Sequence, residues 1–142
     1  MKKISCLMLV LLLIMSVIGC GKDKEKEKAQ YLQIADDTVA KNAQEFPLYH
    51  VTSGYDEESG KYIIGACVNE EYITNLVEEE LDVEGDMKQL AIKATLTQND
   101  TNEEAIEGLM ESMKLSASIV SSELDMEIVA AYVNLDGEMT YY

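Results

Sequence analysis

The chain has 142 residues, among them 27 aspartates and glutamates and 11 lysines, and its net charge at pH 7 is −16. Such a surface repels nucleic acid and anionic lipid headgroups, so the composition argues against both as partners. Basic proteins, cationic peptides and divalent cations are the ligands that this charge attracts. The same charge would also keep a tethered domain soluble.

Residues 1–19 have the layout of an export signal. Lys2 and Lys3 precede an apolar run from residue 4 to residue 18. A permanent membrane span needs about 20 apolar residues, so this shorter run suits a cleaved signal. A secretory signal that is cut elsewhere and an uncleaved anchor are the alternatives.

The segment Val17-Ile18-Gly19-Cys20 ends the apolar run. It resembles the lipobox of bacterial lipoproteins, in which a signal peptidase cuts before a cysteine that already carries lipid. The resemblance implies that Cys20 becomes the N-terminus and carries a diacylglyceryl group on its sulfur. Two acyl chains anchor a protein stably, so the rest of the chain would lie outside the membrane. The resemblance says nothing about the domain that follows.

Residues 20–29 are predicted to form a charged tether, because lysine alternates with acid from Lys22 to Lys28 and no core can form there. Residues 30–142 are long enough for one domain. From Tyr31 onward, five lysines face 24 acidic residues, which gives a net charge of about −19. Once Cys6 and Cys20 are set aside, only Cys67 remains, and an intramolecular disulfide is excluded.

The first half of the domain is predicted to form a helix over residues 30–46, which Pro47 ends, and a hairpin. The strands of the hairpin are residues 48–54 and 61–68, joined by a turn at 56–60. If Gly54 faces Lys61, His50 is opposite Gly65. The second strand is apolar on both faces, which predicts a central strand covered on both sides.

Further along the chain, Asn69 is a candidate cap for a helix over residues 70–80, followed by an acidic loop at 82–86. Residues 87–98 alternate and are predicted to form a strand, whereas residues 101–121 form a helix with a Thr101–Glu104 capping box. A strand over 124–133, a turn at 136–137 and residues 138–142 close a second hairpin. The expected fold class is therefore α+β, with an antiparallel or mixed sheet of about five strands and about three helices.

The acidic loop is one candidate site. Asp82, Glu84 and Asp86 have the first three ligand spacings of a calcium-binding EF-hand loop. Met87 occupies the position where that loop needs glycine, and Lys93 the position of its bidentate glutamate. The loop is therefore not an EF-hand. A weak surface calcium site and a solvated loop both remain open.

His50 and Cys67 are a second candidate, since an imidazole next to a thiolate could perform acyl-transfer or redox chemistry. The expected register places the two side chains diagonally on one face of the hairpin. No nucleophile elbow, oxyanion loop or third orienting residue accompanies them in the sequence. A buried structural cysteine beside a half-exposed histidine is the alternative.

The tyrosines of the two hairpins are a third candidate. Tyrosine is enriched at protein interfaces and also in strands, so a partner-binding face and ordinary strand packing are both open. The residues of this candidate face are Tyr49, Tyr55, Tyr62, Tyr132 and Tyr141.

These observations favour a lipid-anchored, extracytoplasmic protein that acts without catalysis, by binding another envelope protein or a cationic ligand. A calcium-dependent module that uses the 82–86 loop is the alternative. A thiol enzyme based on Cys67 and His50 is a more distant one.

Overall fold

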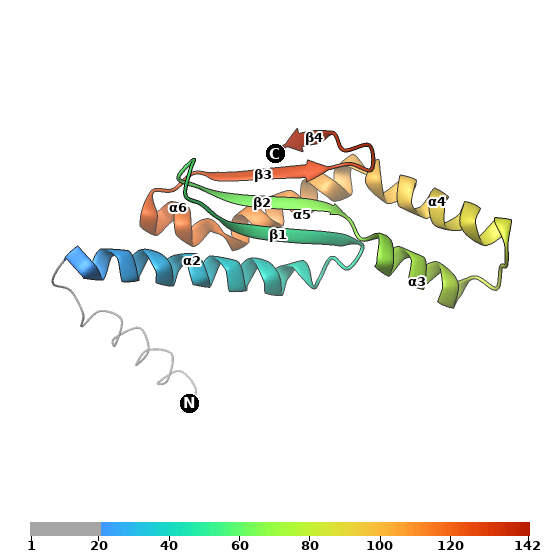
Figure 1. Ribbon diagram of the computed structural model, residues 1–142, viewed down its shortest axis with the longest axis horizontal. Helices are drawn as coiled ribbons and strands as arrows, with labels where there is room; N and C mark the ends of the chain where they lie inside the picture. Colours follow the sequence, from blue (N-terminus) through green and yellow to red (C-terminus); the bar gives the residue numbers. More distant parts are fainter. Residues whose placement is uncertain (1–20) are drawn as a thin grey trace, which may run out of the picture. The chain divides into compact units, whose positions relative to one another are not determined.

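The computed structural model describes residues 21–142 and confirms the predicted α+β class. The segment that resembles a lipobox, including Cys20, lies outside the described residues. In chain order the elements are α2 (Gly21–Ala43), β1 (Tyr49–Asp56), β2 (Lys61–Val68), α3 (Glu70–Glu80), α4 (Asp86–Asp100), α5 (Glu103–Ser116), α6 (Ser118–Leu124), β3 (Ile128–Val133) and β4 (Met139–Tyr141) (Figure 1). None of the described helices is both long and apolar enough to cross a bilayer.

The chain divides into a unit of residues 1–30 and a compact unit of residues 31–142. Helix α2 begins in the first unit, where the side chains of residues 24–27 are exposed. In the compact unit, where a helix was predicted from residue 30, Ala35 and Val39 are buried in the core. The helix ends at Ala43, earlier than Pro47 alone indicated, and a turn leads into the sheet.

The sheet has the order β1-β2-β3-β4. Strands β1 and β2 are antiparallel, β2 and β3 are parallel, and β3 and β4 are antiparallel. A parallel pair needs a long connection, which the four helices α3 to α6 supply. The sheet is therefore mixed, which was one of the two predicted arrangements.

The register of the first hairpin differs from the predicted one. Asp56, not Gly54, pairs with Lys61, so the turn is only residues 57–60. The carboxylate of Asp56 closes this turn by accepting hydrogen bonds from the hydroxyl and N–H of Ser59 and the N–H of Glu58. These bonds, chiefly those from Ser59, lower the pKa of Asp56. A shift of two residues keeps every side chain on its predicted face.

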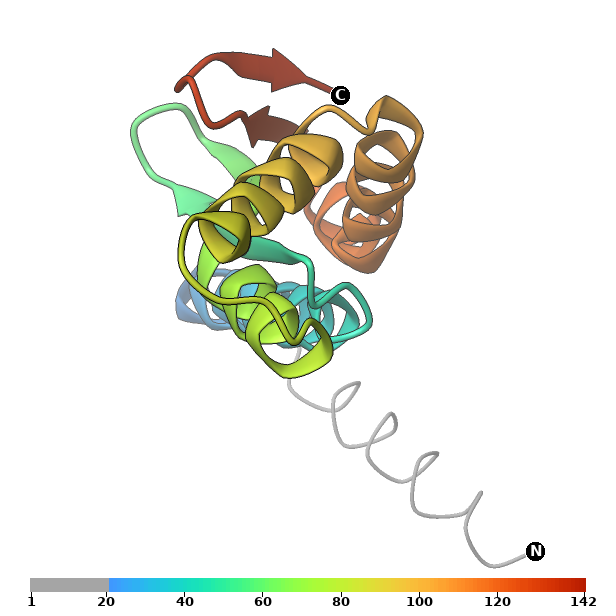
Figure 2. The same cartoon turned by 90° about the vertical axis from the view of Figure 1, so that its right-hand side faces the viewer.

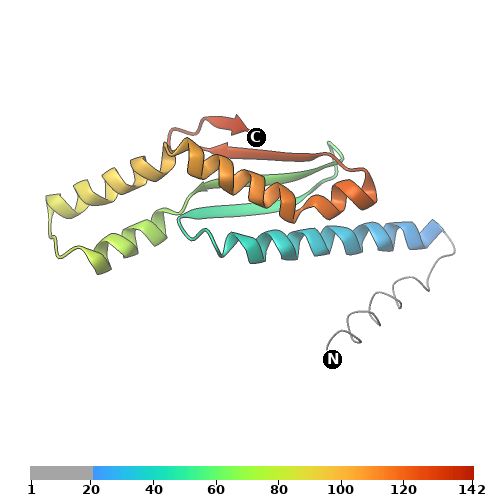
Figure 3. The same ribbon diagram turned by 180° about the vertical axis from the view of Figure 1, so that it is seen from behind.

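Among residues 21–142, helices cover only one face of the sheet. Tyr62 and Ile64 of β2 are buried and pack with α5 and α6, which cross this face in Figure 3. On the opposite face, seen in Figure 1, Ile63 is 39% exposed. The prediction that β2 is covered on both sides is wrong, because an apolar residue on the second face does not require a second layer.

Residues 87–98 are the main correction to the predicted elements. They belong to helix α4, not to a strand. Threonine favours strands, but the Thr95 hydroxyl is accommodated inside the helix, where it donates to the Ala91 carbonyl at 2.8 Å. Lysine, glutamine, leucine and alanine in the same segment favour helix. The described residues therefore contain four strands and five helices, not about five and three.

The helix predicted over 101–121 is split at Ala117 into α5 and α6. Asn102, not Thr101, caps α5, because its side chain accepts a hydrogen bond from the Ala105 N–H. By contrast, the predicted cap of α3 is confirmed: the Asn69 side chain accepts from the Tyr72 N–H at 3.1 Å.

Candidate functional site

Helices α3 and α4 form a hairpin that extends beyond the ends of the strands (Figure 1). Figure 2, turned by 90°, shows the two helices end-on in front of the sheet. Helix α4 has two faces of different character. The first contains half-buried residues at helical spacing, including Ala91, Thr95 and Asn99. None of the 15 residues of α4 is fully buried.

The second face of α4 is apolar or uncharged and uncovered. We call it the α4 outer face and define it as Met87, Leu90, Ala94 and Thr97, whose spacings of three and four place them on one side of the helix. Met87 is 64% exposed and Leu90 is 63% exposed. Exposed apolar side chains that lie together are typical of interaction sites, so this face is the candidate site.

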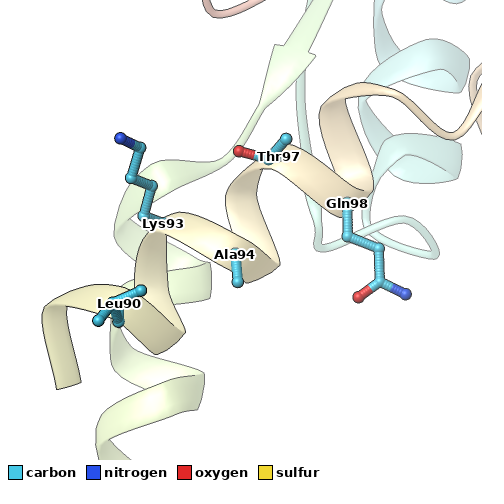
Figure 4. Close-up of a pocket in the computed structure, with 5 residues that line it drawn as sticks. All are labelled: Leu90, Lys93, Ala94, Thr97 and Gln98. Atoms are coloured by element: carbon cyan, nitrogen blue, oxygen red, sulfur yellow. The ribbon is translucent and has the colours of Figure 1, made fainter. Parts of the chain in front are cut away.

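Two shallow hollows lie on and beside this face. The first is lined by residues of α4 alone, shown in Figure 4: Leu90, Lys93, Ala94, Thr97 and Gln98. The second lies between α4 and the turn from β3 to β4, where Ile92, Leu96 and Leu135 contribute apolar surface. Both hollows include Lys93 and Thr97. The surface is open and suits a side chain of a larger partner better than an enclosed small molecule.

Charges surround the α4 outer face without interrupting it. Lys88 forms an ion pair with Glu78 of α3, which ties the two helices together. Glu84 and Asp86 lie at the start of α4, and Asp100 and Asp136 lie near its end. Lys93, which lines both hollows, lies along one side of the face. The face is therefore an apolar strip with a lysine beside it and carboxylates at both ends.

Two buried tyrosines hold the C-terminal end of α4 on the sheet. The Tyr132 hydroxyl donates to the Asp100 carboxylate at 2.9 Å, and the Tyr49 hydroxyl donates to the Asn99 carbonyl at 3.1 Å. The other oxygen of Asp100 accepts from the Leu135 N–H at 3.0 Å. These bonds fix where the helix leaves the core and so position its outer face.

The predicted tyrosine face does not exist as one surface. Tyr49, Tyr62 and Tyr132 are at most 7% exposed and belong to the core, whereas Tyr55 is half-buried against it. Only Tyr141, on β4, is well exposed, at 67%. Alternation along a strand could not show which face the helices would cover.

Each of the three core tyrosines has a raised pKa. Burial is the main cause, because it disfavours the phenolate. The neighbouring carboxylates add to it, Asp36 at Tyr62 and Asp100 at Tyr132. The Tyr62 hydroxyl donates to Asp36 at 2.6 Å, which links β2 to α2. These hydroxyls are structural donors that remain protonated at neutral pH.

The carboxylates proposed as calcium ligands lie between α3 and α4. Asp82 and Glu84 are exposed in the loop, and Asp86 is the first residue of α4. Within residues 21–142, no three His, Cys, Asp or Glu side chains gather closely enough to hold a metal ion.

His50 and Cys67 pair directly across β1 and β2, closer than the diagonal contact that was expected. They share the face of the sheet that none of the helices α2 to α6 crosses. His50 is exposed and Cys67 half-buried. Burial, with the carboxylates of Glu70 and Asp100 as further causes, raises the pKa of the Cys67 thiol. Since the thiolate is the nucleophile, this environment disfavours a reactive cysteine at neutral pH.

The sequence interpretation missed Met87 and Leu90, because it assigned residues 87–98 to a strand. A helical spacing of apolar residues at 87, 90 and 94 was present in the sequence, but alternation at 90, 92, 94 and 96 competed with it. The role of Asp100 had no local signal, because its partners are more than 30 residues away. Comparison of the chain with protein-family models, curated proteins and solved structures found no match.

Proposed function

We propose that this chain is a lipid-anchored, extracytoplasmic interaction module whose α4 outer face binds a basic envelope protein. The observation that carries the proposal is the exposure of Met87 and Leu90 on a helix without a fully buried residue. The similarity of Val17-Ile18-Gly19-Cys20 to a lipobox supports the anchor. Diacylglyceryl on Cys20 would hold the domain at the outer surface of the membrane.

The charge distribution supports a basic partner. The carboxylates at both ends of the α4 outer face would attract lysines or arginines that flank an apolar segment of the partner. The chain's net charge of −16 would speed the encounter at low ionic strength. Full burial of a leucine side chain is worth about 1.5–3 kcal/mol, so covering the exposed part of Leu90 contributes about 1–2 kcal/mol. Such a term corresponds to about a tenfold change in affinity.

The test compares two exposed leucines on different helices. Leu90 lies on the α4 outer face, and Leu115, 74% exposed on α5, is the matched control. A photo-crosslinking residue at position 90 or 115 of the full, anchored chain is activated in intact cells. We expect a discrete adduct from position 90 that is absent from position 115. With the crosslinker moved to position 87, we expect an adduct with the same partner. Leu90→Asp should abolish that adduct, whereas Leu115→Asp should leave it unchanged.

Adducts that are identical from positions 90 and 115, or an adduct that survives Leu90→Asp, would refute the α4 outer face as the binding site. The anchor has a separate test. Cys20→Ala should release the chain from the membrane fraction and abolish incorporation of a labelled fatty acid. Retention of the variant in that fraction would contradict lipidation at Cys20.

A further inference from the structure

In the sheet that the described residues form, strand β4 is an edge strand whose one neighbour is β3. Its side chains are uncovered, with Met139 54% and Tyr141 67% exposed. Natural edge strands are often protected by charged residues or proline, but residues 139–141 include neither. This edge is therefore open to pairing with another strand.

The hydrogen bonds of β4 show which backbone groups point outward. The Tyr142 N–H donates to the Ala130 carbonyl at 2.9 Å, and the Asn134 N–H donates to the Glu138 carbonyl at 2.9 Å. These residues face each other in the register of β3 and β4, so even-numbered residues of β4 turn their N–H and C=O toward β3. The corresponding groups of Met139 and Tyr141 therefore point away from β3, toward the open side of the strand.

We propose that β4 pairs antiparallel with β4 of a second copy of this chain, with Thr140 facing Thr140 on a two-fold axis. In this register Met139 faces Tyr141 of the second copy, and the same pair recurs on the other side of the axis. Both residues have outward N–H and C=O groups, so each pair exchanges two hydrogen bonds. The two sheets then join into one continuous sheet.

The side chains suit this pairing. A methionine sulfur beside a tyrosine ring and a threonine opposite a threonine are both favourable cross-strand contacts. Glu138 faces Tyr142 of the second copy, so no carboxylate side chain stands directly opposite another across the axis. In a chain of net charge −16, an uncharged edge is a place where two copies meet with little like-charge contact. The contact is isologous, which favours a closed dimer over a filament.

The strand has only three residues, so the dimer should be weak and depend on concentration. Sedimentation equilibrium of the full chain in density-matched detergent measures it. We expect a reversible monomer–dimer equilibrium for the wild type and for Thr140→Ser. Thr140→Lys and Thr140→Glu each place like charges on the axis and should raise the dissociation constant at least tenfold. An equimolar mixture of these two variants should recover the dimer.

A wild type that remains monomeric at millimolar concentration would overturn the proposal. So would a dimer that Thr140→Lys and Thr140→Glu leave unchanged, or a mixture that fails to associate. Rescue in the mixture excludes misfolding as the cause of dissociation. A second measurement uses Thr140→Cys, which should form an intermolecular disulfide with diamide, whereas the exposed control Thr38→Cys should not.

The proposed dimer and the proposed binding by the α4 outer face can be refuted independently of each other. The Thr140 variants should leave crosslinking from position 90 unchanged, and Leu90→Asp should leave the dimerisation constant unchanged.

Discussion

The hydrogen bond between Tyr132 and Asp100 joins the core to the end of α4. Substitutions at these two residues therefore test the attachment of α4 directly. The Tyr132 side chain is buried, at 3% exposure, and Asp100 accepts from its hydroxyl and from the Leu135 N–H. Asp100→Ala removes the acceptor and leaves a buried hydroxyl unpaired. Such a group costs about 1–3 kcal/mol, and the loss of a charged acceptor adds to it. We expect Asp100→Ala to lower the free energy of unfolding by about 2–3 kcal/mol.

Tyr132→Phe removes the donor together with its need for an acceptor. Asp100 keeps the Leu135 N–H and contact with solvent, so we expect a smaller loss, of about 1–2 kcal/mol. The double variant should cost about as much as Asp100→Ala alone. The coupling between the two residues should therefore reach at least about 1 kcal/mol, as expected for groups in direct contact.

Urea unfolding of the full chain and its variants, followed by circular dichroism, measures these differences. Tyr141→Phe is the matched control, since its exposed ring should change stability by less than about 0.5 kcal/mol. If the loss of unfolding free energy in the double variant equals the sum of the two single losses within about 0.5 kcal/mol, the coupling is refuted. A loss for Asp100→Ala smaller than that for Tyr132→Phe would refute the argument about the unpaired hydroxyl.

Three further predictions concern pH, metal ions and the thiol. The raised pKa values of Tyr49, Tyr62 and Tyr132 mean that the unfolded chain releases protons above about pH 10 while the folded chain keeps them, so the free energy of unfolding should fall there. In pH-dependent urea melts, Tyr132→Phe should reduce this slope by up to about 1.4 kcal/mol per pH unit, and an unchanged slope would contradict the assignment. Calcium and magnesium should raise the thermal midpoint equally at equal concentration, through charge screening; a calcium-specific rise lost on Asp82→Asn would revive the calcium module. Iodoacetamide at pH 7 should label Cys67 more slowly in the folded chain than in urea, and rapid native labelling would revive the thiol chemistry.

Local signals in the sequence were sufficient for several elements. The boundaries of β2 and the Asn69 cap of α3 agree with the structure, because alternation and a capping side chain act over a few residues. The tight turn before β4 contains Gly137 at φ +82°, a conformation that glycine adopts without strain. The first hairpin illustrates the limit: its strands were correct to within two residues, but its register depended on how Asp56 caps the turn.

Long-range contacts decided the rest. The segment of α4 contains both alternation that suggests a strand and residues that favour a helix. Its packing beside α3 and its attachment through Tyr49 and Tyr132 decide for the helix. The same packing determines which side chains of α4 are exposed to solvent. Periodicity shows that residues share a face, but whether that face meets the core or solvent depends on which elements cover it.

The sequence by itself determined the acidic charge, the absence of a disulfide within the domain, the α+β class and the similarity of residues 17–20 to a lipobox. These depend on composition or on residues close together in the chain. Only the tertiary structure placed three tyrosines in the core, left Met87 and Leu90 exposed and opened the edge of β4. Burial and edge exposure are properties of neighbours distant in sequence, and no local pattern specifies them.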